Sequence, residues 1–163
     1  MMKIDKILPV IYFIPLILIQ VLVVPYFELN GIVPDLILIL LVFYTLKYGQ
    51  LYGIILGFIL GALTDFSTGS ILGSSMFTKT LSAFIAGYFY NENIVGTITK
   101  SPLFLGIIFL TSLVNAIAFS LIANFDISLN LISLLYDQGF LPALYTTIIA
   151  SIVIIFSPKR SYI

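Results

Sequence analysis

The chain has 163 residues, of which 61% are hydrophobic and 9% are charged; its formal net charge is zero and its mean hydropathy is +1.20. A soluble domain is usually about one quarter charged, so this composition excludes an ordinary soluble domain and predicts a single integral membrane domain over residues 1–163. Cysteine and histidine are absent, which excludes disulfides, thiolate or imidazole metal sites and Cys or His nucleophiles; we expect no cofactor, no metal and, given the balanced charge, no nucleic acid.

The first apolar run, residues 7–27, is long enough to cross a membrane. As a helix it rises about 30 Å, which is one hydrocarbon thickness. Lys3 and Lys6 precede the run, as basic residues do in a signal peptide. The run is too long for a signal-peptide core, however, and no small-x-small cleavage site follows it. We therefore predict a helix that is retained in the membrane.

The next two apolar segments, residues 33–46 and 51–63, are short. Pro34 and Asp35 are typical of a helix start, with the proline in the first turn and the carboxylate beside the positive end of the helix dipole. Each segment would rise only about 20 Å as a helix, which is less than the hydrocarbon core. Either both segments span the membrane with help from their flanks, or they form a hairpin that re-enters from the outer side.

Glycines recur at every fourth position around the third segment, at Gly49, Gly53, Gly57 and Gly61. A glycine inside a helix costs about 1 kcal/mol relative to alanine, so the repeat needs a compensating gain. In lipid, small residues let a neighbouring helix approach closely, and the repeat therefore predicts a groove for such a helix. That helix belongs either to this chain, which is the commoner arrangement, or to a partner protein. Replacing Gly57 with leucine is expected to block the approach and to loosen partner binding.

A polar turn follows the glycines and leads into the fourth segment, residues 71–90. Small polar residues and glycines between Asp65 and Gly73 predict a tight turn. Lys79 lies about two turns into the following helix, and a charge at the bilayer centre costs roughly 3 kcal/mol or more. We therefore expect Lys79 to face protein or to reach outward, with Asp65 as its acidic partner. The pair is either a salt bridge between two helices or part of a binding site.

Asp35 and Asp65 both lie on the predicted outer side and raise the question of acid–base chemistry. The sequence supplies no nucleophile, phosphate-binding loop or oriented base beside them. We therefore do not expect an enzyme.

Residues 102–123 and 140–156 complete a set of six predicted crossings, which places both termini on one side. If that side is cytoplasmic, the basic residues inside are Lys3, Lys6, Lys47, Lys100, Lys159 and Arg160. The acidic residues outside are then Glu28, Asp35, Asp65, Asp126 and Asp137. This asymmetry follows the positive-inside rule; Lys79 falls outside the pattern, and Glu92 is an acid on the inner side. Lys47 is assigned to the inside only if the two short segments span.

Residues 126–138 have apolar residues at helical spacing with polar residues between them. This pattern predicts an amphipathic helix on the outer surface that closes the gap between the last two spans.

The central third of the sequence resembles the MreD family of bacterial rod shape-determining membrane proteins. The matching features are Pro34-Asp35 before a leucine-rich segment, a short basic turn, a glycine-rich stretch, an acid and a small-residue turn. The residues that carry the resemblance are Pro34, Asp35, Gly49, Gly57, Gly61, Asp65, Gly73 and Gly87.

The resemblance implies a fold, a location and partners. It implies an all-α bundle of six helices, similar to the substrate-binding subunits of energy-coupling-factor transporters, in the bacterial cytoplasmic membrane with both termini cytoplasmic. It implies no enzymatic activity, but association with MreC, a protein with one membrane helix. Through MreC it implies membership of the elongation machinery that contains MreB, RodA and a class-B penicillin-binding transpeptidase.

Hypotheses from three classes follow. The first is a non-catalytic membrane scaffold of the cell-wall elongation complex. The second is a small-molecule binding subunit of a vitamin transporter, which a tightly retained vitamin would favour, although the outer loops are poor in converging polar side chains. The third, an intramembrane enzyme, would be eliminated by an Asp35 and Asp65 double alanine variant with unimpaired function.

Overall fold

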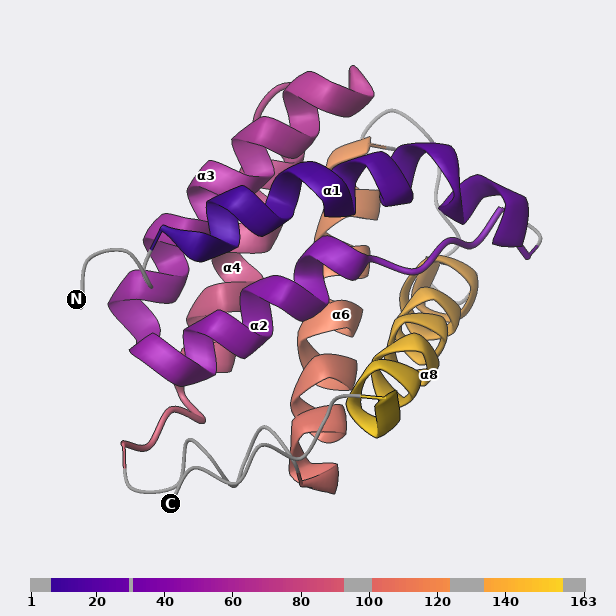
Figure 1. The fold of residues 1–163 in the computed structure, drawn as a ribbon. Helices are drawn as coiled ribbons and strands as arrows, with labels where there is room; N and C mark the ends of the chain where they lie inside the picture. The colour runs from indigo at the N-terminus through magenta and orange to yellow at the C-terminus, as the bar shows by residue number, and fades with distance from the viewer. Residues whose placement is uncertain (1–6, 30, 93–100, 124–133, 157–163) are drawn as a thin grey trace.

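The computed structural model describes residues 7–29, 31–92, 101–123 and 134–156, and the part of the chain that it describes is all-helical. The predicted all-α class is confirmed, and each predicted segment contains one α-helix (Figure 1). The α-helices are α1 (Leu8–Leu22), α2 (Leu36–Tyr48), α3 (Gln50–Thr68), α4 (Ser74–Gly87), α6 (Pro102–Ala123) and α8 (Leu141–Phe156), with a 3-10 turn η1 (Val24–Phe27) and a π-helical turn η2 (Leu134–Phe140).

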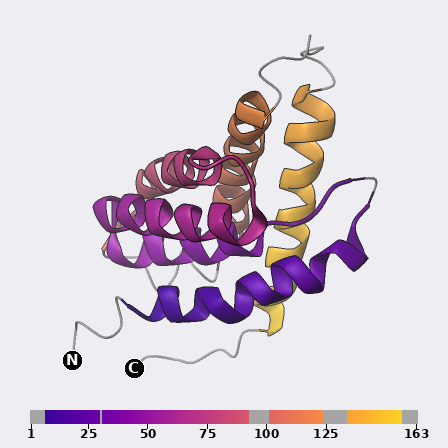
Figure 2. The same ribbon diagram turned by 90° about the horizontal axis from the view of Figure 1, so that it is seen from above.

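The helices form two groups that meet in one core. α3 and α4 make the most extensive contacts in the bundle, and α2 packs against both of them. α6 and α8 lie side by side and are steeply inclined to α2, α3 and α4 (Figure 2). α4 also contacts α6, which joins the two groups. α1 lies across one side of the bundle, where it contacts α2 and α3.

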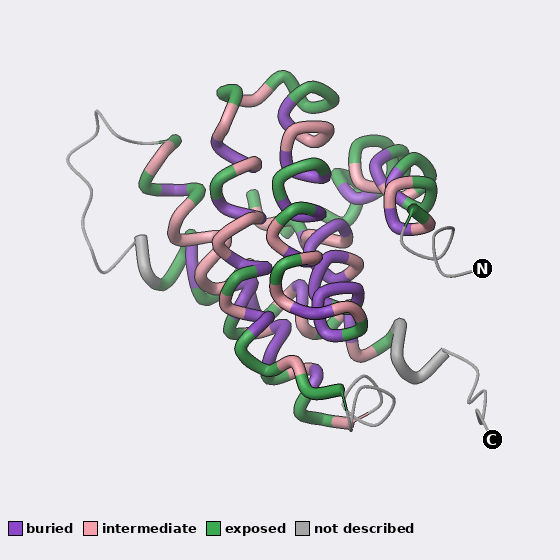
Figure 3. The backbone as a smooth tube through the Cα atoms, turned by 90° about the vertical axis from the view of Figure 1, so that its left-hand side faces the viewer, coloured by how far each residue is buried: buried purple, intermediate pink, exposed green. Residues whose placement is uncertain are grey.

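The surface of the bundle is strongly apolar, and its core is centred on α2. Leu38, Leu41 and Val42 of α2 are completely buried. Large apolar side chains on the outer faces are exposed, including Ile14 at 61% and Phe58 at 53%. Figure 3 shows buried segments turned inward and exposed segments turned outward along the helices. Outward apolar faces of this extent are what lipid or an apolar partner would cover.

Helix α3 extends further than the sequence predicted. Its apolar run ends at Leu63, but the helix continues to Thr68. Thr64 Oγ1 donates to the Leu60 carbonyl at 2.7 Å, and Ser67 Oγ donates to the Leu63 carbonyl at 2.7 Å. Each hydroxyl donates to a backbone carbonyl of the preceding helical turn. Small polar residues that usually favour a turn are therefore accommodated within the helix.

The added length matters for crossing a membrane. α3 now rises about 28 Å, and α3 and α6 are both long and apolar enough to cross a membrane. α2 remains short, at about 20 Å, so the choice between a spanning and a re-entrant α2 stays open.

Other predicted segments are trimmed at their ends. α1 ends at Leu22, and the rest of the first apolar run forms η1 around Pro25. α4 begins at Ser74, because residues 71–73 belong to the turn that precedes it. Of the predicted amphipathic helix, residues 126–133 lie outside the described residues, and residues 134–138 fall in η2. The chain ends, residues 1–6 and 157–163, also lie outside them.

Candidate functional site

Two of the four repeating glycines face α4. A Cβ added at Gly57 would lie 2.8 Å from the backbone carbonyl oxygen of Lys79. One added at Gly61 would lie 2.5 Å from the backbone carbonyl oxygen of Ser75 and equally close to Met76 Cα. Such contacts with backbone leave no room for a side chain. The groove at Gly57 and Gly61 is therefore occupied by a helix of the same chain.

The other two glycines have different roles. An added Cβ at Gly53 would clash with the Thr45 side chain of α2. Gly49 is the single residue between α2 and α3, and its φ of 98° is a conformation that favours glycine. The described structure therefore offers no continuous glycine groove to a partner, and Gly57→Leu would test the α3–α4 contact rather than partner binding.

Asp65 organises the turn between α3 and α4. Its Oδ1 accepts from Ser70 Oγ at 2.9 Å and from the backbone N–H of Ser75 at 3.0 Å. Its Oδ2 accepts from the backbone N–H of Gly73 at 2.9 Å. Gly73 has a φ of 99°, and it immediately precedes α4. The carboxylate thus caps the first N–H groups of α4 from the preceding helix, which is favourable beside the positive end of the helix dipole.

Asp35 caps α2 and joins it to two other helices. Its Oδ1 accepts from the backbone N–H of Leu38 at 2.9 Å, and Pro34 lies just before the helix rather than in its first turn. Its Oδ2 accepts from Lys79 Nζ of α4 and, at 3.4 Å, from Asn115 Nδ2 of α6. The Lys79 side chain is 5% exposed and that of Asp35 is 23% exposed.

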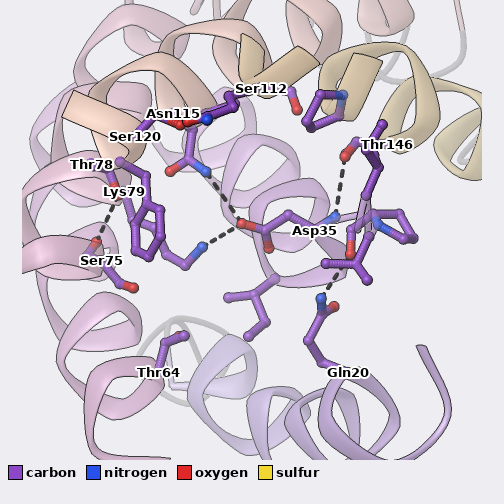
Figure 4. A pocket seen from close by; sticks show the side chains of 18 of the residues that line it. Gln20, Asp35, Thr64, Ser75, Thr78, Lys79, Ser112, Asn115, Ser120 and Thr146 are labelled. Atoms are coloured by element: carbon purple, nitrogen blue, oxygen red, sulfur yellow. Dashed lines mark hydrogen bonds and ion pairs between the residues drawn. The ribbon is translucent and has the colours of Figure 1, made fainter. Parts of the chain in front are cut away.

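The expected pairing of Lys79 with Asp65 was wrong. Asp65 already accepts hydrogen bonds from its own turn and from the start of α4. Asp35 approaches α4 from α2 and meets the lysine there (Figure 4). Lys79 does form a salt bridge between two helices, which was one of the two interpretations offered for it. Its partner is Asp35 of α2 rather than Asp65 of α3.

Two more helices reach the same point. The backbone N–H of Asp35 donates to Thr146 Oγ1 of α8 at 3.1 Å. Gln20 of α1 donates from Nε2 to the Pro34 carbonyl at 2.7 Å and accepts at Oε1 from the backbone N–H of Leu36 at 3.0 Å. We call Gln20, Asp35, Lys79, Asn115 and Thr146 the Asp35 network. The network ties α1, α2, α4, α6 and α8 together at one end of the bundle, which we call the Asp35 end.

A cavity of about 490 Å³ adjoins the Asp35 network. Its lining comes from every α-helix named above and from η2. All members of the Asp35 network line it, as does Ser112 of α6 (Figure 4). Asp137 of η2 also lines it. The described residues contain no group of three His, Cys, Asp or Glu side chains that could hold a metal ion. The groups that a ligand would meet in the cavity are therefore hydrogen-bonding side chains and the Lys79–Asp35 ion pair.

A family model for the rod shape-determining protein MreD matches residues 2–158. The chain belongs to the MreD family. The match extends well beyond residues 34–90, which carried the resemblance in the sequence, and covers nearly all of the chain. MreD-family proteins are membrane proteins that act in rod-shape determination, and the family is structural rather than enzymatic. No curated protein and no solved structure gave a significant match, so the likeness to transporter subunits stays a prediction.

Sequence reasoning missed three members of the Asp35 network in this MreD-family chain, namely Gln20, Asn115 and Thr146. Each is a polar residue in a largely apolar helix. Such residues usually face the interior of a membrane bundle, and this rule would have selected them as candidates. It would not have shown that they meet at Asp35, because that depends on how the helices are rotated and packed.

Proposed function

We propose that this chain is a non-catalytic membrane scaffold of the cell-wall elongation complex and that it binds an MreC-like single-span protein. The observation that carries the proposal is the family match over residues 2–158. Through that partner the chain would join MreB, RodA and a class-B penicillin-binding transpeptidase, directly or indirectly. Its part in rod-shape determination would then be to hold other proteins in place in the bilayer.

The distribution of polar and apolar groups supports a scaffold. The Asp35 network and the Asp65 turn join the helices to one another through polar side chains, and Asp65 and Lys79 are buried there. The exposed side chains of α1 and α3 are largely apolar. A single membrane helix packs on such a surface by close van der Waals contact. We propose that the partner helix lies on one of these outward faces, because Gly57 and Gly61 are already used by α4.

We further propose that the chain crosses the bacterial cytoplasmic membrane several times, with both termini in the cytoplasm. The α2–α3 hairpin supports this orientation. Lys47 lies near its turn, whereas Asp35 and Asp65 lie at the opposite end, where both contact α4. The positive-inside rule places the end that carries Lys47 in the cytoplasm, which leaves Asp35 and Asp65 at the outer end.

The orientation can be measured with single cysteines, because the chain has none of its own. Glu28→Cys should react with a membrane-impermeant maleimide in intact spheroplasts. Ser161→Cys should react only after the membrane is permeabilised. The opposite pattern would reverse the proposed orientation, and reaction of both in intact cells would place the two positions on the same, outer side.

Partner contact can be tested by cross-linking in membranes that contain the MreC-like protein with a cysteine in its own membrane helix. Single cysteines at Ile14 on α1, Phe58 on α3 and Ile148 on α8 sample three exposed faces. We expect one face to cross-link strongly. Leu38→Cys, at a completely buried position, is the control and should give no product. If no exposed position on any described helix cross-links while both proteins are present, direct binding through the bundle surface is wrong.

A further inference from the structure

The cavity beside the Asp35 network has the size and position of a ligand site. Its volume of about 490 Å³ lies within the range of roughly 300–1,000 Å³ that is usual for small-molecule sites. It lies where α2, α4 and α8 begin and near where α3 ends, and its lining includes the loop residues 31–35. In the proposed orientation, this end of the bundle faces the outside of the cell.

One buried acceptor beside the cavity lacks a donor. Asn115 lines the cavity and donates one of the two N–H groups of Nδ2 to Asp35. Its Oδ1 is buried and accepts no hydrogen bond from the described residues. Figure 4 shows this oxygen turned away from Asp35. A buried carbonyl without a donor is unfavourable, so a ligand donor that reached this oxygen from the cavity would satisfy a group that the described residues leave unsatisfied.

The charges on the wall exclude one class of ligand. The charged residues that line the cavity are Asp35, Lys79 and Asp137. Lys79 already pairs with Asp35, and Asp137 is exposed on η2. An anion entering the cavity would therefore meet two carboxylates and one ammonium that is already neutralised. An uncharged ligand avoids this repulsion and leaves the ion pair intact.

The rest of the wall favours a molecule with an apolar side. Ile37, Ala116, Phe119 and Pro142 line the cavity together with hydroxyl groups of Ser112 and Thr146. We propose that this cavity binds one small uncharged molecule that carries hydroxyl or amide N–H donors and enters from the Asp35 end. This site goes beyond the proposed scaffold function, because partner binding through the outward faces does not require an occupied cavity.

The test uses the full chain extracted from its own membranes in mild detergent. Native mass spectrometry should show a retained small uncharged molecule at one per chain, or one added N-acetylglucosamine when that sugar is supplied as an uncharged, donor-rich probe. Glucuronate, an anion of similar size, should add at least tenfold less. Asn115→Leu should reduce occupancy at least tenfold, whereas Asn91→Leu, the same change at an exposed position after α4, should not.

A second variant covers the case in which Asn115→Leu does not fold. Ala116→Phe fills the cavity with apolar volume and keeps Asn115, and it should also abolish occupancy while circular dichroism stays unchanged. A phospholipid or an anion as the retained molecule would overturn the proposal. So would the absence of any retained molecule together with no N-acetylglucosamine binding, because the cavity would then hold only water.

Discussion

Asp35 and Asp65 lie at the same end of the bundle, and they are used in different ways. The donors to the Asp65 carboxylate lie 5 to 11 residues along the chain, in the turn and at the start of α4. The hydrogen-bond partners of Asp35 on other helices lie 44, 80 and 111 residues away. Asp65 therefore fixes local backbone, whereas Asp35 fixes tertiary structure.

The difference also separates a closed site from an open one. Asp65 is buried, and both of its oxygens accept backbone N–H groups. The Asp35 side chain is partly exposed and lines the cavity. A carboxylate with a full set of local donors has no capacity left for a ligand, so of these two aspartates Asp35 is the one that can combine structural support with binding.

The largest expected effect comes from removing the closed site. Asp65→Ala leaves the N–H groups of Gly73, Ser75 and Met76 without their acceptor, and the Ser75 N–H is buried. An unsatisfied buried donor costs about 1–3 kcal/mol and the loss of a helix cap costs about 1 kcal/mol, so we expect a loss of about 3 kcal/mol in the free energy of unfolding. Thermal unfolding in mild detergent measures it. Asp137→Ala, at an exposed acid, is the control; equal stability of the two variants would contradict the capping role.

The ion pair of the open site should give the next largest effect. Asp35→Asn keeps a good helix-capping side chain but leaves Lys79 charged and unpaired. We expect a loss of about 2–3 kcal/mol, below the usual cost for a fully buried pair because Asp35 is partly exposed. Adding Lys79→Met should recover part of this loss, since no buried charge then remains. Additive losses in the double variant would mean that the two side chains do not interact.

A matched pair of glycine changes tests the contact between α3 and α4, which connects the Asp65 turn with the Asp35 network. Gly57→Ala forces a methyl group against the Lys79 backbone and should cost about 1–3 kcal/mol. Gly106→Ala places the same methyl group in open space on α6 and should be neutral or slightly stabilising. Unfolding temperatures of the two variants, compared with the parent chain, decide the matter. A tolerated Gly57→Ala would show that α3 and α4 can separate at little cost.

The smallest effect is expected at the edge of the Asp35 network. Thr146→Val keeps the shape of the side chain but removes the acceptor for the Asp35 backbone N–H. One such bond contributes about 1 kcal/mol. Thr147→Val is the control, because its hydroxyl donates to the Ala143 carbonyl of its own helix. Hydrogen exchange at the Asp35 amide should accelerate in the first variant and not in the second.

The sequence predicted the helices better than it predicted their contacts. Apolar runs located the six α-helices of the described residues, and residues 102–123 were predicted with the bounds that α6 has. The end of α3 was missed because Thr64, Ser67 and Thr68 are typical turn residues, yet their hydroxyls bond within the helix. Lys79 was assigned to the acid nearest along the chain, but its partner is Asp35, which only the packing of α2 on α4 brings close.

The large sequence separation within the Asp35 network determines when its contacts can form during synthesis of the chain. Asp65 can find its donors as soon as Met76 has left the ribosome. The Asp35 amide has to wait for Thr146, after most of the chain has been synthesised. Until α8 arrives, a polar group at the start of α2 stands without its acceptor, which is costly away from water. A nascent chain that stops before α8 therefore lacks the acceptor for the Asp35 amide as well as its last helix.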